Sequence, residues 1–147
     1  MFEFEADRNY FEALLCEDRE SINDFKNLFD FRPVDKKRSE FNQERNKLLV
    51  QLLSSHGRNC MLQFPMCDIS SGINIDHLIP LATNKLNKEL RNLVAEPGQK
   101  VRSQSFGSNH LDNLIIACAN CNNHKKHRII EREKLMSILR IKMDAKG

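Results

Sequence analysis

The chain has 147 residues, of which 40% are hydrophobic and 29% charged, and its formal net charge at pH 7 is +3. This length and apolar content are typical of one modest domain with a real core, alone or with an appendage. No apolar run approaches the roughly 18 residues that a transmembrane helix needs. The acidic N-terminus also lacks the pattern of a signal peptide, so we expect a cytoplasmic protein without a membrane partner.

The charge is unevenly distributed along the chain. Residues 1–40 contain 11 acidic and 7 basic residues, whereas residues 41–147 contain 9 acidic and 16 basic residues. The basic part is where a polyanion such as nucleic acid would be attracted, although the same excess is compatible with an ordinary solvated surface. Charge alone therefore leaves both interpretations open.

The first third of the chain predicts helices. Apolar residues at helical spacing indicate two helices within residues 5–30, and the segment SIND from Ser21 resembles a capping box that starts the second one. Pro33 breaks the pattern, and a third helix is predicted over residues 39–55, with Gly57 as its stop signal. We therefore expect a helical N-terminal region, residues 1–56.

The rest of the chain mixes strand-like and helical segments. Residues 58–80 favour two short strands or a hairpin, and they end with the stretch INIDHLIP at 73–80. Residues 81–111 are polar, with a helix predicted over 84–93 and a loop over 98–110. A strand is then predicted over 111–118 and helical structure over 119–143. These elements predict an α+β fold in which residues 57–147 form the second unit.

The cysteines carry the first functional signal. An odd count of five, in a chain without a signal peptide, argues against a disulfide framework. Cys118 and Cys121 form a CxxC pair, which can bind a metal or act as a redox pair, and Cys60 and Cys67 form a looser pair. Together the four predict a closed Cys₄ site for structural zinc, which would stabilise a compact unit. Cys16, in a helical apolar pattern, is predicted to be a buried small hydrophobe.

Asp76 and His77 are polar residues in the middle of an apolar stretch. Carboxylate and amide oxygens are hard ligands, so Asp76 and Asn122 are candidate ligands of a second metal, Mg²⁺ or Mn²⁺. His77 is a candidate base that takes a proton from an attacking water. The alternatives are an ordinary hydrogen-bonded Asp-His pair and an asparagine that only caps a helix.

Strand geometry separates the acid from the base. Neighbouring residues of a strand point to opposite faces. His77 would share one face with Ile73, Ile75 and Ile79, and Asp76 would lie on the other face. This arrangement suits one metal ligand beside a separate base better than two ligands of one metal.

Taken together, IDHLIP, DNLIIACANCN and Lys125 resemble the His-Asn-His (HNH, ββα-metal) endonucleases over residues 58 to about 130. The resemblance implies a ββα-metal nuclease core that contains an insertion, residues 81–111, and is followed by a C-terminal helix. It also implies that Cys60, Cys67, Cys118 and Cys121 form the structural zinc knuckles of the family.

The resemblance assigns a role to each matching position. His77 looks like the general base, and Asp76 and Asn122 look like the ligands of the catalytic divalent metal, in an Asn-ended variant of the family. Asn113 takes the place of the middle asparagine, which orients the histidine and steadies the loop. His124, two residues beyond Asn122, is the competing ligand.

The resemblance implies a DNA substrate. We expect hydrolysis of double-stranded DNA, with Lys125, Lys126 and Arg128 contacting the backbone and the loop with Lys100 and Arg102 reaching the duplex. The helical N-terminal region, residues 1–56, would serve dimerisation or DNA contact. The basic helical residues also fit a solvated face. A homodimeric restriction enzyme fits by analogy only, as does a homing, phage or defence nuclease. The alternatives are a non-catalytic zinc-stabilised DNA-binding module and an interaction protein that acts through its helical N-terminus.

Overall fold

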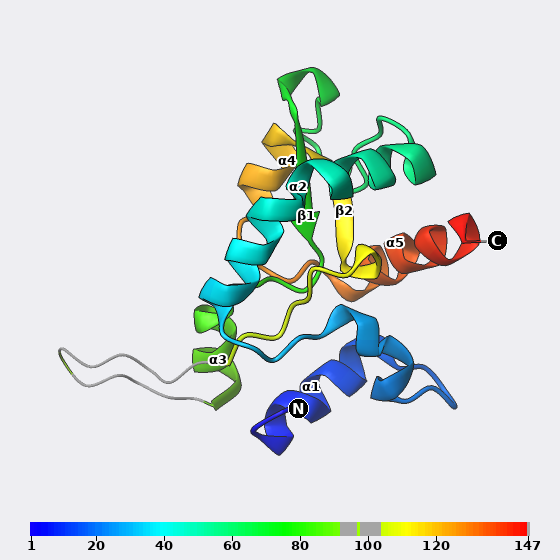
Figure 1. The fold of residues 1–147 in the computed structure, drawn as a ribbon. Coiled ribbons are helices and arrows are strands. Elements are labelled where there is room, and N and C mark those ends of the chain that lie inside the picture. The colour runs from blue at the N-terminus through cyan, green and yellow to red at the C-terminus, as the bar shows by residue number, and fades with distance from the viewer. Residues whose placement is uncertain (92–96, 98–103, 147) are drawn as a thin grey trace.

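The computed structural model describes residues 1–91, 97 and 104–146, and these residues form a small α+β fold (Figure 1). Helices surround a sheet of two antiparallel strands. In chain order the elements are α1 (Glu5–Leu15), η1 (Ile22–Leu28), α2 (Val34–His56), η2 (Ile69–Ser71), β1 (Ile73–His77), α3 (Asn84–Arg91), η3 (Leu111–Asn113), β2 (Leu114–Cys118), α4 (Ala119–Lys125) and α5 (Arg132–Ala145). The α+β prediction is confirmed at this level.

The N-terminal helices begin and end at their predicted signals, except that α2 begins earlier than expected. The capping box at Ser21 is present, and its backbone N–H donates to Asp24 at 2.8 Å. It starts η1, a 3₁₀ segment. Helix α2 begins at Val34 instead of residue 39, because Pro33 stands at its N-cap and needs no helical hydrogen bond there. Gly57 ends α2 with φ +70°, as predicted.

The sheet joins two segments that are distant in the chain. β1 pairs with β2, from Ile73 opposite Cys118 to His77 opposite Leu114. Of the two short strands or hairpin predicted within residues 58–80, only β1 is present, because 58–72 contains only η2 and irregular backbone. β2 is buried throughout and supplies a better apolar partner for β1.

The two faces of the sheet pack on different apolar clusters. Ile75, Leu114 and Ile116 contact Leu48 and Leu52 of α2, which lies across the strands in Figure 1. The opposite face contributes Ile115 and Ala117 to a larger cluster that also contains side chains of α1, η1 and α5, namely Phe11, Leu15, Leu28, Leu135, Ile138 and Leu139. Residues 1–56 therefore share both clusters with residues 57–147.

The segment after β2 is divided into two helices. α4 ends where Lys126 takes φ +52°, which a helix cannot continue, and α5 begins six residues later at Arg132. The predicted continuous helical stretch over 119–143 is thus broken. Of the helix predicted over 84–93, α3 covers 84–91, and the remainder lies outside the described residues. None of the described helices has the length and apolar content needed to cross a membrane.

Candidate metal centre and adjoining cleft

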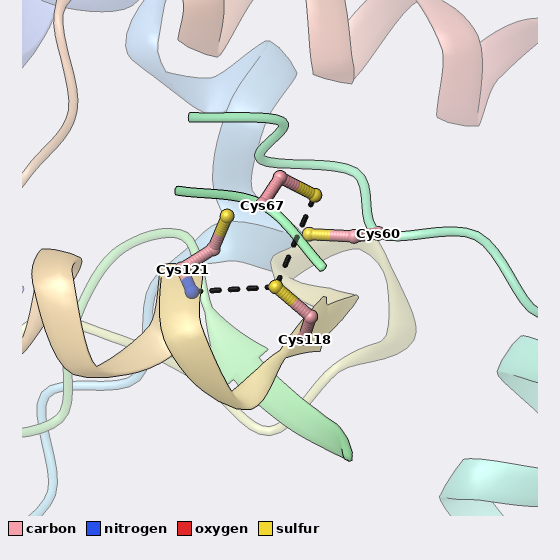
Figure 2. A group of neighbouring side chains, drawn as sticks. All are labelled: Cys60, Cys67, Cys118 and Cys121. Atoms are coloured by element: carbon pink, nitrogen blue, oxygen red, sulfur yellow. Dashed lines mark hydrogen bonds between the residues drawn. The ribbon is translucent and has the colours of Figure 1, made fainter. Parts of the chain in front are cut away.

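Four of the five cysteines come together at one end of the sheet (Figure 2). Cys60 follows α2, Cys67 precedes η2, Cys118 ends β2 and Cys121 lies in the first turn of α4. Their Sγ atoms all lie within 4.8 Å of one another, and those of Cys67 and Cys118 are 3.9 Å apart. Tetrahedral zinc with Zn–S bonds of about 2.3 Å requires S–S distances of about 3.8 Å. The cluster can therefore hold a metal ion such as zinc.

The four thiols are not electrostatically equivalent. Burial alone would raise the pKa of Cys118, but backbone N–H groups of Cys121 and Asp68, at 3.3 and 3.4 Å from its Sγ, lower the pKa to about 6. Burial and the neighbouring thiols raise the pKa of Cys67 and of Cys121. The protein environment thus favours one thiolate, and a bound divalent cation would favour the loss of the remaining protons.

Cys16 stands apart from this cluster. It is half-buried rather than buried as predicted, because α1 ends at Leu15 and Cys16 already has an extended backbone at the C-cap. Burial and the carboxylates of Glu12, Glu20 and Asp24 raise the pKa of its thiol. Its thiolate is disfavoured, so Cys16 also lacks the environment of a reactive cysteine.

An open cleft of about 590 Å³ lies beside the carboxyl end of β1. Its walls come from three parts of the chain: α2, β1 with the residues that follow it, and α4 with the residues that follow it. The lining residues are Arg38, Phe41, Asn42, Asp76, His77, Pro80, Leu81, Ala82, Asn122, Asn123, Lys126 and His127. The structure therefore brings Asp76, His77 and Asn122 to one cavity. His124 is not among the lining residues, and its ring packs on Phe64 at a centroid distance of 5.1 Å.

Asp76 is a buried carboxylate with a buried cation beside it. Its Oδ2 lies 3.0 Å from Nζ of Lys125, and that ammonium also donates to the carbonyl oxygen of His77 at 2.9 Å. Burial raises the pKa of Asp76, and the positive charge of Lys125 opposes this rise. Lys125 is only 1% exposed, so it does not lie on the surface, where contact with DNA was expected. Its position is explained by the negative charge of Asp76.

His77 is held in one tautomer by Asn109. The amide nitrogen of Asn109 donates to the carbonyl of Lys37 at 2.8 Å, so its Oδ1 faces His77 Nε2, 2.9 Å away. Because Oδ1 can only accept, Nε2 carries the proton and Nδ1 keeps its lone pair. Burial lowers the pKa of His77 to about 4, although the hydrogen bond to Asn109 acts in the opposite direction, so the ring is neutral at pH 7.

The prediction that His77 shares one face of its strand with Ile73, Ile75 and Ile79 is confirmed for two of the three isoleucines. The ring of His77 packs on Phe41 of α2 with centroids 4.8 Å apart, on the side where Ile73 and Ile75 also contact the α2 cluster. Ile79 instead lies in the other cluster, because β1 ends at His77 and the alternation stops there.

Asn113 holds the backbone that follows β1. Its fully buried amide donates to the carbonyls of Ile79 and Ser108 at 3.0 and 2.8 Å, and its Oδ1 accepts from Ile79 N–H at 2.8 Å. These bonds hold the backbone after β1 against the segment before η3. The side chain that contacts His77 is that of Asn109, which the sequence analysis did not identify.

The predicted basic contacts differ in their environments. Lys126 is exposed and lines the cleft, and Arg128 is exposed beside a neighbouring cavity, where its guanidinium donates to the carbonyls of His124 and Lys125. Lys100 and Arg102 lie outside the described residues.

Four further polar residues of the cleft were missed by the sequence analysis, namely Arg38, Asn42, Asn123 and His127. Arg38 and Asn42 have the i, i+4 spacing that places them on one face of a helix, and this spacing was available as a signal. His127 follows α4 and had no distinguishing pattern.

Comparison of the chain with known protein families, with curated proteins and with solved structures gave no match. The chain therefore has a small α+β fold, a tetracysteine cluster that can bind a metal, and a cleft that is lined in part by α4.

Proposed function

We propose that this protein is a metal-dependent endonuclease that hydrolyses phosphodiester bonds in double-stranded DNA. The observation that carries the proposal is the common cleft of Asp76, His77 and Asn122, which come from different elements. The succession of β1, β2 and α4 beside a cysteine cluster supports a ββα-metal arrangement of the HNH kind. A homodimer and a restriction role remain parts of this proposal that rest on analogy.

Two metals belong to the proposal. The tetracysteine cluster is closed to further ligands when all four thiolates bind zinc, so its role is structural. Asp76 and Asn122 would hold Mg²⁺ or Mn²⁺, and their hard oxygen donors fit either ion. When bound, this ion supplies electrostatic stabilisation of the charge that develops on the phosphate and the leaving oxygen.

His77 performs the proton transfer in this mechanism. Its neutral ring, with the lone pair on Nδ1, accepts a proton from the attacking water. Asn109 keeps the other nitrogen protonated, so the basic nitrogen is the same in every turnover. Lys126 is an exposed cation of the cleft and attracts the phosphate backbone.

One observation favours the alternative of a non-catalytic zinc-stabilised DNA-binding module. Lys125 already supplies a positive charge 3.0 Å from Asp76, so the buried carboxylate has a structural partner without a second metal. Under this alternative His77 is dispensable, and loss of its imidazole leaves DNA binding unchanged.

The deciding experiment is plasmid cleavage by the zinc-loaded protein with and without Mg²⁺ or Mn²⁺. We expect cleavage that requires the divalent ion and is abolished in His77→Ala. A matched control is His124→Ala, which removes a neighbouring imidazole that does not line the cleft and should leave cleavage within about twofold of wild type. Equal cleavage by wild type and His77→Ala would refute the mechanism, and binding without cleavage on varied DNA would favour the alternative.

A further inference from the structure

We propose that the N-terminal half of α2 is a nucleic-acid-binding wall of the cleft, with Arg38 contacting the phosphate backbone of duplex DNA and Asn42 contacting it beside Arg38. This inference rests on the proposed function and adds to it a surface that lies outside the nuclease resemblance. Arg38, Phe41 and Asn42 follow the i, i+3, i+4 spacing of one helix face, and all three line the cleft.

The same face of α2 has two functions along its length. In the C-terminal half, Leu48 and Leu52 pack on the sheet. In the N-terminal half, Phe41 packs on the ring of His77. Arg38 and Asn42, on the same helix face, are exposed polar side chains. The helix therefore anchors on the sheet at one end and forms a side of the cleft at the other.

Buried contacts fix this wall to the base of the cleft. Lys37 is fully buried, and its ammonium donates to the carbonyls of Asp30 and Gly107 at 2.5 and 2.6 Å. Its own carbonyl accepts from Asn109, the residue that also holds His77. Arg38, the next residue in the helix, is thereby kept at a defined position relative to the proposed reacting centre.

The charges of the cleft fit a polyanion held between two walls. Arg38 stands on the α2 wall, and Lys126 stands on the wall that follows α4. Neither cation has a carboxylate within ion-pair distance among the residues that the structure describes, whereas the single acid of the lining, Asp76, is paired with Lys125.

The acidic side chains of α2 do not cancel this charge. Glu40 is bound by Arg32 at 2.7 Å, and none of the three acids of α2, Asp35, Glu40 and Glu44, lines the cleft. Two cations of one cleft, neither ion-paired within the described part of the chain, match the repeating charge of a phosphate backbone.

The test measures DNA binding by the full chain in a His77→Ala background, which prevents cleavage. A fluorescent duplex of mixed sequence is titrated over a salt series with the parent, Arg38→Gln and Arg140→Gln. Arg140 is the matched control, an exposed arginine on α5 that does not line the cleft. We expect Arg38→Gln to weaken binding about tenfold and to lower the salt slope by about 0.9, the effect of losing one phosphate contact.

Arg140→Gln should remain within about twofold of the parent, because it removes the same charge away from the cleft. Arg38→Lys should retain most of the salt slope, since it keeps the positive charge. Equal binding by Arg38→Gln and Arg140→Gln would overturn the inference.

The outcome is separable from that of the proposed function. If wild type cleaves and Arg38→Gln binds like the control, the α2 wall is refuted and the nuclease assignment stands. If wild type does not cleave but Arg38→Gln binds more weakly than the control, the wall stands and the nuclease assignment fails.

Discussion

At the scale of single residues, the cleft depends on two pairs that cross between elements, one buried and one half-buried. Asp76 of β1 is paired with Lys125 of α4, and His77 is paired with Asn109 of the loop before η3. The first pair compensates a buried charge, and the second selects a tautomer. They can be separated experimentally, because the first affects stability and the second affects the chemistry of His77.

Replacing Lys125 with methionine should destabilise the fold by about 3–5 kcal/mol, because Asp76 would keep a buried and uncompensated charge. The double variant Asp76→Asn/Lys125→Met should recover a large part of this loss, since both charges are then absent. Urea unfolding followed by circular dichroism, on samples with equal zinc content, measures both effects. Equal destabilisation of the single and double variants would show that the pairing is not the cause.

Replacing Asn109 with alanine should lower cleavage about 10- to 100-fold, the range typical of residues that orient a functional side chain. The physical reason is that His77 Nε2 loses its acceptor, so the tautomer is no longer fixed. The ¹⁵N chemical shifts of the His77 ring report this directly. They should indicate protonated Nε2 in wild type and a mixture in Asn109→Ala.

Asn123→Ala is the control for this prediction. It removes an asparagine that lines the cleft and, unlike Asn109, is not the hydrogen-bond partner of His77. Unchanged ring shifts in Asn109→Ala would contradict the positioning role, whatever happens to cleavage.

At the scale of elements, α2 links the apolar core to the cleft. Its start is held by Arg32, whose guanidinium contacts Asp30 at 2.8 Å and Glu40 at 2.7 Å. The hydrogen bonds of Arg32 lower the pKa of Glu40, and they lower that of Asp30 although burial alone would raise it. The orientation of the α2 wall therefore includes a contribution that depends on pH.

The sign of this dependence follows from the lowered pKa values. Asp30 and Glu40 have ordinary pKa values of 3.8 and 4.5, and both are lower in the folded protein. Their stabilising contribution is present above those ordinary values and is lost as pH falls through the lower folded values. Between about pH 6 and pH 3, wild type should thus lose its stability advantage over Arg32→Gln.

The free energies of unfolding of the two proteins, measured in urea over this pH range, test the prediction. The difference between the two proteins is the quantity to compare, because acid would also release any metal bound by the cysteines, equally in both proteins. A difference that stays constant over the whole range would exclude a contribution from Asp30 and Glu40.

At the scale of the whole molecule, the tetracysteine cluster joins the loop after α2 to the end of β2 and the start of α4. These segments border both apolar clusters, so the loss of a bound metal would affect more than one loop. In a chain of this size, metal-binding free energy becomes folding free energy.

We expect one zinc ion per chain, and we expect its removal by a chelator to lower the melting temperature by at least about 10 °C, because the bound ion stabilises only the folded state. Cys118→Ser should lose zinc and show the lower melting temperature without chelator. Cys16→Ser is the matched control and should retain both zinc and stability. Metal analysis and calorimetry give the two readouts, and full zinc content in Cys118→Ser would contradict the ligand assignment.

The sequence by itself determined the local features of this protein. The capping box at Ser21, the stop at Gly57 and the CxxC at Cys118 depend on residues a few positions apart, so spacing was enough to predict them. The α+β class followed from the spacing of apolar residues, and the two cysteine pairs were visible in the sequence. That the two pairs meet is a tertiary contact. The start of α2 was predicted five residues too late, since a proline such as Pro33 can precede a helix as well as interrupt one.

Only the tertiary structure decided which distant residues meet. The partner of β1 is β2 rather than a nearby strand, because pairing is settled by burial of apolar faces against α2 and the larger cluster. The same packing buries Lys125 on Asp76 and brings Asn109 to His77. Such contacts depend on how elements cross in space, and neither the periodicity nor the spacing of one segment contains that information.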